Sequence, residues 1–248
     1  MINGNRTPTT ATEERVQTLN IRANGHRLHC LRAGSGPSVV LLHGGASDSR
    51  DWVETMTAFS HSHTLHAPDI LGYGKSDRTR TAYYLREFVE STLEFIRELD
   101  FDSHVLVGHS IGGRVCLEIA LRHPELVHKL VLIDTAGFGK LARWGMYMGA
   151  AMYWLRRMLH VEQPYPRFLK EDGEDRDWRC LGRLPELRVP TLIVWNRRDP
   201  YYPVSHAFAA SQLVPDVRLE VFPGYGHAPH LQRRDRFNEL LLDFLSSG

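Results

Sequence analysis

The chain of 248 residues contains few cysteines: Cys30, Cys116 and Cys180 are its only three, and they are far apart in the sequence. An odd, scattered set lacks the close pairs that a zinc site or a disulfide framework requires. We therefore expect a protein of a reducing compartment, the cytoplasm, without structural disulfides.

An excess of charge of either sign is also missing. Lysine and arginine number 30 against 29 aspartates and glutamates, which leaves a net charge of +1. This balance does not favour nucleic acid or an anionic membrane as a partner. We expect a small-molecule substrate of low charge, and the composition does not determine the oligomeric state.

Long hydrophobic runs are absent too. The N-terminal stretch MINGNRTPTTATEERV is polar and lacks the apolar core of a secretion signal, so residues 1–14 are expected to form a flexible tail. A later uncharged stretch, Trp144 to Leu155, is much shorter than the roughly 20 residues that span a bilayer. We expect no stable membrane insertion.

Short apolar runs alternate with helical patterns along most of the chain. This alternation predicts an α/β domain in which helices cover both faces of a mostly parallel sheet. An Asn-Gly pair between two earlier runs is a hairpin signal and predicts an antiparallel edge. The predicted strands are Val16–Ile21, His26–Ala33, Val39–Leu42, Thr64–Ala67, Val105–Val107, Leu130–Ile133, Leu192–Trp195 and Leu219–Phe222, and the predicted helices include Tyr84–Leu99, Arg114–Arg122, Val204–Leu213 and Asp235–Leu245.

One interval interrupts the alternation. Between Asp134 and Leu192 a helical stretch rich in aromatic residues and methionine precedes the charged segment KEDGEDRDWR. We interpret residues 138–184 as a helical cap inserted over the carboxyl edge of the sheet, with residues 15–137 and 185–248 forming the core.

The motif VLVGHSIGG places Ser110 between Gly108 and Gly112, directly after a predicted strand. Chance alone produces a Gly-x-Ser-x-Gly pattern in roughly one such chain in eleven, so the context matters more than the motif. A tight turn from strand to helix requires small residues two positions before and after the serine, and it exposes the hydroxyl at the positive end of a helix. The alternative is a glycine-rich turn with a capping serine.

A serine nucleophile needs a base and an acid that orients the base. His227 follows the last predicted strand, at the sheet edge where Ser110 lies, and His230 is its nearest competitor. Asp199 follows another strand and is the favoured acid, while Asp134, at the end of LVLID, also reaches this edge.

An oxyanion hole would complete the site. The N–H of Ile111, next after the serine, is one expected donor. The other is expected from the loop after VVLLHGG, at Gly45, with Ala46 in reserve, while His43 shapes this loop. No metal or organic cofactor is expected, because histidines and carboxylates do not fall at ligand spacing and no phosphate-binding loop occurs.

Together these segments resemble the α/β-hydrolase superfamily from Val16 to Leu245, through HGG, PDILGYGKSD, GHSIGG, RRDPYYP and GYGHAPH, with the serine, aspartate and histidine in that family's order. The resemblance implies an eight-stranded sheet with a cap after the sixth strand. It implies structural roles for Asp69 and Ser76. A serine at position 110 argues against haloalkane dehalogenases and epoxide hydrolases, which have an aspartate there.

The cap concentrates aromatic and methionine side chains, and we expect Trp144, Tyr147, Met148 and Met152 to line the substrate pocket. The alternatives are packing against the sheet, or an amphipathic helix on a membrane or partner surface, which nearby arginines permit.

The resulting hypothesis is a carboxylesterase-like serine hydrolase that cleaves a small, mostly apolar ester or thioester through an acyl-enzyme. The alternative is a hydrolase that splits carbon–carbon bonds of vinylogous diketones, a group to which the resemblance also extends. Some members of the superfamily act instead as ligand receptors with slow turnover or none, and an acyltransferase or perhydrolase would use the same acyl-enzyme.

Overall fold

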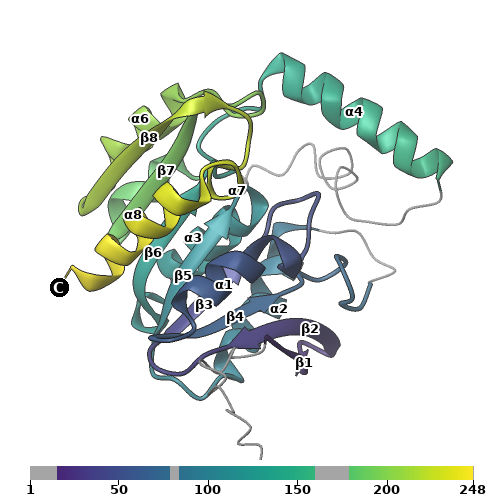
Figure 1. Cartoon of the computed structure of the whole chain (residues 1–248). Helices are drawn as coiled ribbons and strands as arrows, with labels where there is room; N and C mark the ends of the chain where they lie inside the picture. The colour runs from purple at the N-terminus through teal and green to yellow at the C-terminus, as the bar shows by residue number, and fades with distance from the viewer. Residues whose placement is uncertain (1–15, 79–83, 160–178, 248) are drawn as a thin grey trace, which may run out of the picture.

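An eight-stranded sheet forms the centre of the protein, in the order β1-β2-β4-β3-β5-β6-β7-β8 (Figure 1). The computed structural model describes residues 16–78, 84–159 and 179–247. Strands β3 to β8 run parallel, which confirms the predicted mostly parallel sheet. The strands are β1 Gln17–Ala23, β2 His26–Ala33, β3 Ser38–Leu42, β4 Thr64–Pro68, β5 His104–His109, β6 Val127–Ile133, β7 Thr191–Arg198 and β8 Val217–Tyr225.

The hairpin predicted from the Asn-Gly pair forms the antiparallel edge. Asn24 and Gly25 connect β1 to β2, and both have positive φ, 50° and 75°. Two such residues build the type I′ turn, whose twist matches that of the flanking strands. Because β2 also pairs antiparallel with β4, the hairpin joins the parallel part of the sheet.

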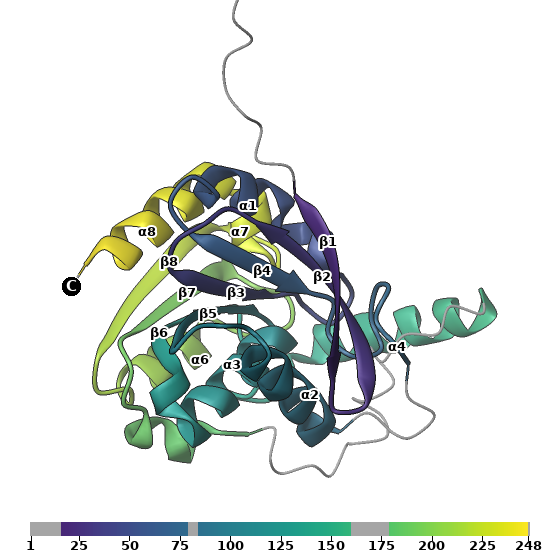
Figure 2. The ribbon, with the colours of Figure 1, turned by 90° about the horizontal axis from the view of Figure 1, so that it is seen from below.

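Helices cover both faces of the sheet (Figure 2). Alternate strand residues face opposite ways, so Val40 and Leu42 pack into one core while Val39 and Leu41 pack into the other. The first core includes α2 Leu85–Arg97, α3 Ile111–Arg122 and α6 Ser205–Ser211, and the second includes α1 Val53–Phe59 and α8 Arg234–Ser246. Helix α1 and the short α7 Pro229–Gln232 were not among the predicted helices.

Helix α4, Arg143–Met158, lies in the interval predicted as the cap. Both views show it extending away from the sheet (Figures 1 and 2). The cap boundaries stay a prediction, because residues 160–178, including most of the charged segment, lie outside the described residues, as does the predicted tail 1–14. None of the described helices combines the length and apolar character needed to cross a membrane.

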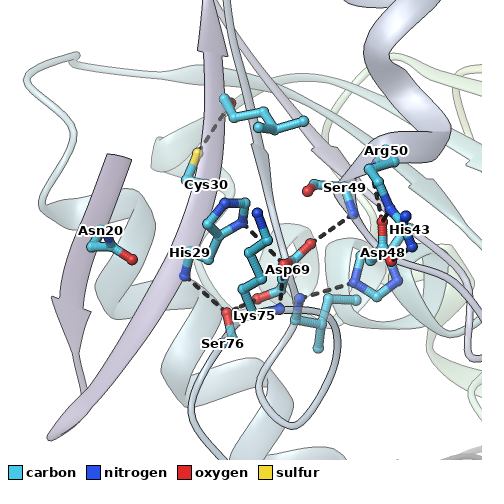
Figure 3. A network of polar contacts seen from close by, with 12 residues as sticks. Asn20, His29, Cys30, His43, Asp48, Ser49, Arg50, Asp69, Lys75 and Ser76 are labelled. Carbon is cyan, nitrogen blue, oxygen red and sulfur yellow. Dashed lines mark hydrogen bonds and ion pairs between the residues drawn. The ribbon is translucent and has the colours of Figure 1, made fainter. Parts of the chain in front are cut away.

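The loop after β4 is organised by the buried carboxylate of Asp69 (Figure 3). Its two oxygens accept the backbone N–H groups of Ser49 and Lys75 at 2.7 and 2.8 Å. The hydroxyl of Ser76 donates to the Asp69 carbonyl at 2.6 Å and accepts the N–H of His29 at 2.9 Å. Each of these bonds involves a backbone group of β2, of the segment after β3 or of this loop, which agrees with structural roles for Asp69 and Ser76.

A buried ion cluster connects α3 with the end of the cap interval. Glu118 and Arg114 are each 1% exposed and lie 2.8 Å apart, and Arg183 of the short helix η4, Leu181–Glu186, bonds to Glu118 at 2.9 Å. Burial alone raises the pKa of Glu118, but Arg114, Arg183 and Arg122 outweigh it and lower the pKa to about 2. The cluster therefore anchors η4 to the core through a charged carboxylate.

Candidate active site

Ser110 occupies the tight turn between β5 and α3. Its backbone has φ 53° and ψ −114°, a conformation that residues other than glycine rarely adopt. A Cβ on Gly108 would lie 2.5 Å from the carbonyl oxygen of Gly112 and the nitrogen of Gly113. The two flanking glycines are therefore required by close contact, as the motif predicted.

Neighbouring backbone holds this strained turn in place. The N–H of Ser110 donates to the carbonyl of Ile133 at 2.8 Å, and the Ser110 carbonyl accepts the N–H groups of Arg114 and Ala136, each at 3.1 Å. The serine is thus fixed between α3 and the end of β6.

The structure brings together the three predicted catalytic side chains. His227 Nδ1 lies 2.7 Å from Asp199 Oδ2, and His227 Nε2 lies 2.9 Å from the hydroxyl oxygen of Ser110. An ionised carboxylate only accepts, so Nδ1 carries the proton and Nε2 presents a lone pair to the serine hydroxyl. Asp199 Oδ1 accepts the N–H groups of Tyr201 and Tyr202 at 2.7 and 3.1 Å, which orients the carboxylate.

Asp134, the alternative acid, also lies at the site. Its Oδ2 is 3.9 Å from His227 Nδ1 and, within the described part of the chain, has no hydrogen-bond partner, while Oδ1 accepts the N–H of Asn196 at 2.8 Å. Burial and then the negative charge of Asp199 raise the pKa of Asp134 well above its usual range. The raised pKa favours the neutral form of Asp134, and of the two carboxyls only Asp199 hydrogen bonds to the histidine.

His109 makes a contact that sequence reasoning missed. Its Nε2 hydrogen bonds to the backbone carbonyl of His227, and the two rings lie 4.9 Å apart. Burial lowers the pKa of His109 well below its usual range. A neutral imidazole therefore supports the loop that carries His227; only its position before Ser110 in the motif hinted at this.

His230, the competing base, is turned away from the serine. Its ring stacks on Trp52 at 4.6 Å, and neither ring nitrogen has a hydrogen-bond partner among the described residues. Burial, with the nearby His227 and Arg234, lowers the pKa of His230 to about 3. It therefore serves as packing beneath the site.

The loop after β3 approaches Ser110 at Gly44. A Cβ there would lie 2.5 Å from His109 Nδ1 and 3.5 Å from the Ser110 Cβ. The buried His43 accepts the N–H of Ile70 on Nε2 at 2.9 Å, so its Nδ1–H donates to the Gly44 carbonyl at 2.8 Å. That carbonyl belongs to the peptide that carries the Gly45 N–H, the expected oxyanion donor, so His43 sets the direction of this N–H.

Ile111, the expected oxyanion donor next to the serine, is the first residue of α3. An N–H in the first turn of a helix has no partner inside the helix and lies at the positive end of its dipole. Ile111 follows the serine directly, and Gly44, the residue before Gly45, approaches it from the loop after β3; the oxyanion role of the Ile111 and Gly45 N–H groups stays a prediction.

Ligand atoms of His109, Asp134 and His227 all lie within 4.8 Å of one another, a grouping that matches metal sites in residue type. Both ring nitrogens of His227, however, already bond to Asp199 and Ser110. A cation on His227 would have to break that chain of hydrogen bonds, so the triad explains the grouping better.

The predicted pocket residues all lie on α4. Trp144, Tyr147 and Met152 are 61%, 63% and 37% exposed, and Met148 is partly buried. Only the start of α4 lies close to the triad: the N–H of Ala142 donates to the Tyr201 carbonyl at 2.8 Å, and the Tyr201 ring lies 4.8 Å from that of His227. That the four predicted residues of α4 line the substrate pocket stays a prediction.

A family model described as "Alpha/beta hydrolase family" matches residues 39–240. The chain belongs to this family. The α/β-hydrolase fold accounts for the sheet order and for the position of Ser110 at its carboxyl edge.

The sequences of curated relatives match nearly the whole length of this chain. The 2-hydroxy-6-oxo-6-phenylhexa-2,4-dienoate hydrolase of Burkholderia cepacia is 28% identical, over 96% of this chain and 98% of that protein. The 2-hydroxymuconate semialdehyde hydrolase of a Pseudomonas species is also 28% identical, over 92% and 93%. An uncharacterised protein of Mycobacterium tuberculosis is 28% identical over 93% of this chain and 82% of its own length.

Solved structures share the fold. A serine hydrolase involved in carbazole degradation, CarC, is 25% identical with a TM-score of 0.78, covering 94% of this chain and 99% of its own. The carboxylesterase CesB of Bacillus subtilis has a TM-score of 0.79 at 24% identity, covering 94% and 93%. Similar proteins thus include both esterases and enzymes that cleave carbon–carbon bonds.

Proposed function

We propose that this α/β hydrolase is a carboxylesterase-like serine hydrolase, which cleaves a small, mostly apolar ester or thioester through an acyl-enzyme on Ser110. The observation that carries the proposal is His227, which bridges Asp199 at 2.7 Å and Ser110 at 2.9 Å. This distance pattern gives the serine a base and the base an orienting anion.

In the first half of the reaction, the Ser110 oxygen attacks the substrate carbonyl carbon while His227 Nε2 takes the hydroxyl proton. The carbonyl oxygen gains negative charge, and the N–H groups of Ile111 and Gly45 stabilise it. Protonated His227, stabilised by Asp199, then donates its proton to the leaving alcohol or thiol as the tetrahedral centre collapses to the acyl-enzyme.

In the second half, water replaces the alcohol. His227 Nε2 accepts a proton from the water as its oxygen attacks the acyl carbon, and the same two N–H groups hold the oxyanion. Collapse returns the proton to Ser110 and releases a carboxylic acid. No group outside the chain is required.

A substrate without charge near the reacting carbonyl suits this site best. The carboxylate of Asp199 lies 2.7 Å from His227 Nδ1, and its negative charge would repel an anionic group of the substrate near the histidine. Met148, which is partly buried on α4, supplies apolar surface for an acyl or leaving group. The three cysteines are all free and buried, which supports the reducing cytoplasm as the compartment.

Hydrolysis of a carbon–carbon bond beside a ketone is the second candidate. The observation in its favour is the 28% identity to hydrolases named for dienoate and muconate semialdehyde substrates. The same serine, histidine and oxyanion donors would serve, but the leaving group would be a carbon stabilised by conjugation.

The deciding experiment compares p-nitrophenyl acetate, butyrate and octanoate, an alkyl thioester, and 2-hydroxy-6-oxo-6-phenylhexa-2,4-dienoate at equal concentrations. We expect the esters to be hydrolysed with kcat/KM at least tenfold above that for the dienoate. Ser110→Ala, the matched control, should lose about 10³-fold or more in kcat.

Two results would contradict the proposal. A larger kcat/KM for the dienoate would select carbon–carbon hydrolysis. Turnover below about one per minute on every substrate, together with tight binding of one of them, would select a ligand receptor with an intact triad.

A further inference from the structure

Helix α4 has its large apolar side chains facing water. Tyr147, Leu155 and Met158 are 63%, 49% and 74% exposed, and Trp144 is 61% exposed. Among the residues of α4 whose burial is described, Gly145 and Gly149, one turn apart, are the buried ones. A helix on a globular domain normally buries its large apolar face and exposes its polar one.

Close packing against the core explains the glycine face. A Cβ on Gly145 would lie 3.0 Å from Tyr201 Cα and 3.2 Å from the carbonyl oxygen of Pro200. A side chain at this position would need the loop to move by a few tenths of an ångström, so glycine favours this close start of α4. Figures 1 and 2 show that the helix projects from the rest of the domain, and its large apolar side chains are exposed there.

Helix α4 and its immediate flanks carry charge of one sign, and the first acidic residue after the helix is Glu162. Residues 135–161 contain Lys140, Arg143, Arg156 and Arg157 and no aspartate or glutamate. The overall net charge of +1 conceals this local excess, because acidic residues elsewhere in the chain balance it. Lys140 and Arg143, at the start of the helix, are exposed.

We propose that α4 lies on the surface of an anionic lipid bilayer, with its exposed apolar face among the headgroups and acyl chain ends. Tryptophan and tyrosine suit this region because their rings are apolar with one polar edge, and each cation near the surface gains attraction to anionic lipid. Charge argues against a second copy as the occupant, because two such helices would bring their cations together.

Docking in this way places the candidate active site at the bilayer surface. The N–H of Ala142, just before α4, donates to the Tyr201 carbonyl at 2.8 Å, and the Tyr201 ring lies 4.8 Å from that of His227. The start of the helix and the triad thus share one loop. This inference goes beyond the hydrolase activity, and its test does not depend on turnover.

The test is flotation of the full-length protein with vesicles of phosphatidylcholine containing about a third phosphatidylglycerol, and with vesicles of pure phosphatidylcholine. We expect flotation with the anionic vesicles that falls at least tenfold with the neutral ones, and that weakens when salt is raised. The double variant Leu155→Gln/Met158→Gln should lose at least tenfold in binding to anionic vesicles. Both side chains are exposed, so folding should be unaffected.

The matched control is Leu213→Gln/Leu242→Gln, which removes two leucines that are 38% and 48% exposed outside α4. We expect this variant to float like the unmodified protein. Circular dichroism of both variants establishes that they are folded. Lys140→Gln/Arg143→Gln should reduce the preference for anionic over neutral vesicles.

Three results would overturn the proposal. They are the absence of flotation with either kind of vesicle, equal binding to neutral and anionic vesicles, and unchanged binding of the folded α4 double variant. If the protein does not bind vesicles but sediments as a dimer, and Leu155→Gln/Met158→Gln converts it to a monomer, the face would instead be the contact with a second copy.

Discussion

Asp134 lies 3.9 Å from Nδ1 of His227 without bonding to it. Asp199 accepts a hydrogen bond from that nitrogen at 2.7 Å, and the pKa of Asp134 is raised by burial and by the charge of Asp199. This arrangement leaves a second acid within reach of the catalytic base, and it makes the roles of the two aspartates separable.

Asp199→Ala should lose less activity than a serine hydrolase loses when its only orienting acid is removed. Loss of such an acid costs about 10⁴-fold in kcat. Without the charge of Asp199, the pKa of Asp134 falls and its carboxylate can turn to His227, so we expect a loss of about 10²–10³-fold. Ester hydrolysis should recover as the pH rises, because Asp134 must be ionised to act.

The double variant Asp199→Ala/Asp134→Asn completes this test. It should lose at least a further tenfold relative to Asp199→Ala, whereas Asp134→Asn alone should change kcat by less than about threefold. Equal activity of the single Asp199 variant and the double variant would show that Asp134 does not reach the histidine.

Asp134→Asn should stabilise the protein at neutral pH. The folded state raises the pKa of this carboxyl, so between the unfolded value of about 3.9 and the folded value the unfolded chain is ionised while the native chain stays protonated. Stability from this group is therefore present at low pH and is lost as the pH rises. We expect urea unfolding to show that the variant is more stable at pH 7 and that this gain shrinks toward pH 4; a gain that does not depend on pH would contradict the reasoning.

His43→Phe should impair catalysis more than binding. The substitution removes the donor that holds the Gly44 carbonyl and thereby the direction of the Gly45 N–H. Loss of one oxyanion donor costs about 10²–10³-fold in kcat, so a misdirected donor should cost about 10–10²-fold with KM changed less than threefold. Steady-state kinetics on p-nitrophenyl butyrate measure both values, and an unchanged kcat would rule out this role for His43.

Glu118→Gln should destabilise the fold by about 3–5 kcal/mol, because it leaves the buried Arg114 without its anionic partner. Since Glu118 has a lowered pKa of about 2 in the folded state, its contribution is present above the unfolded value of about 4.3 and is lost as the pH falls toward 2. Chemical unfolding at pH 7 and pH 3 should show the variant's deficit shrinking at low pH. Glu239→Gln, at an exposed site of α8, serves as the control and should change stability by less than about 0.5 kcal/mol.

Much of the fold followed from local patterns. Apolar runs such as Val39–Leu42 are buried on both faces of the sheet and read as continuous strands, and Asn24 and Gly25 favour one type of hairpin turn. Helix α1 was missed because its buried residues Thr55, Met56 and Phe59 are too few to form a clear helical period.

The identity of the candidate triad residues also followed from the sequence. The carboxyl ends of parallel strands meet at one edge, so Ser110, Asp199 and His227 could be placed together from strand order alone. The distances between these side chains could not be predicted. Asp199 lies 2.7 Å from His227 Nδ1 and Asp134 lies 3.9 Å from it, a difference of about one ångström that is set by packing around β6 and β7.

The sequence by itself determined the sheet, the nucleophile turn and the residues that compete for each role, because these depend on periodicity and on the few residues that tolerate a tight turn. Only the tertiary structure decided which carboxyl stays neutral, that His109 supports the His227 loop, and that α4 turns its apolar face outward. Those outcomes depend on burial and on contacts between residues far apart in the chain, such as Gly145 with Tyr201, which no local pattern encodes.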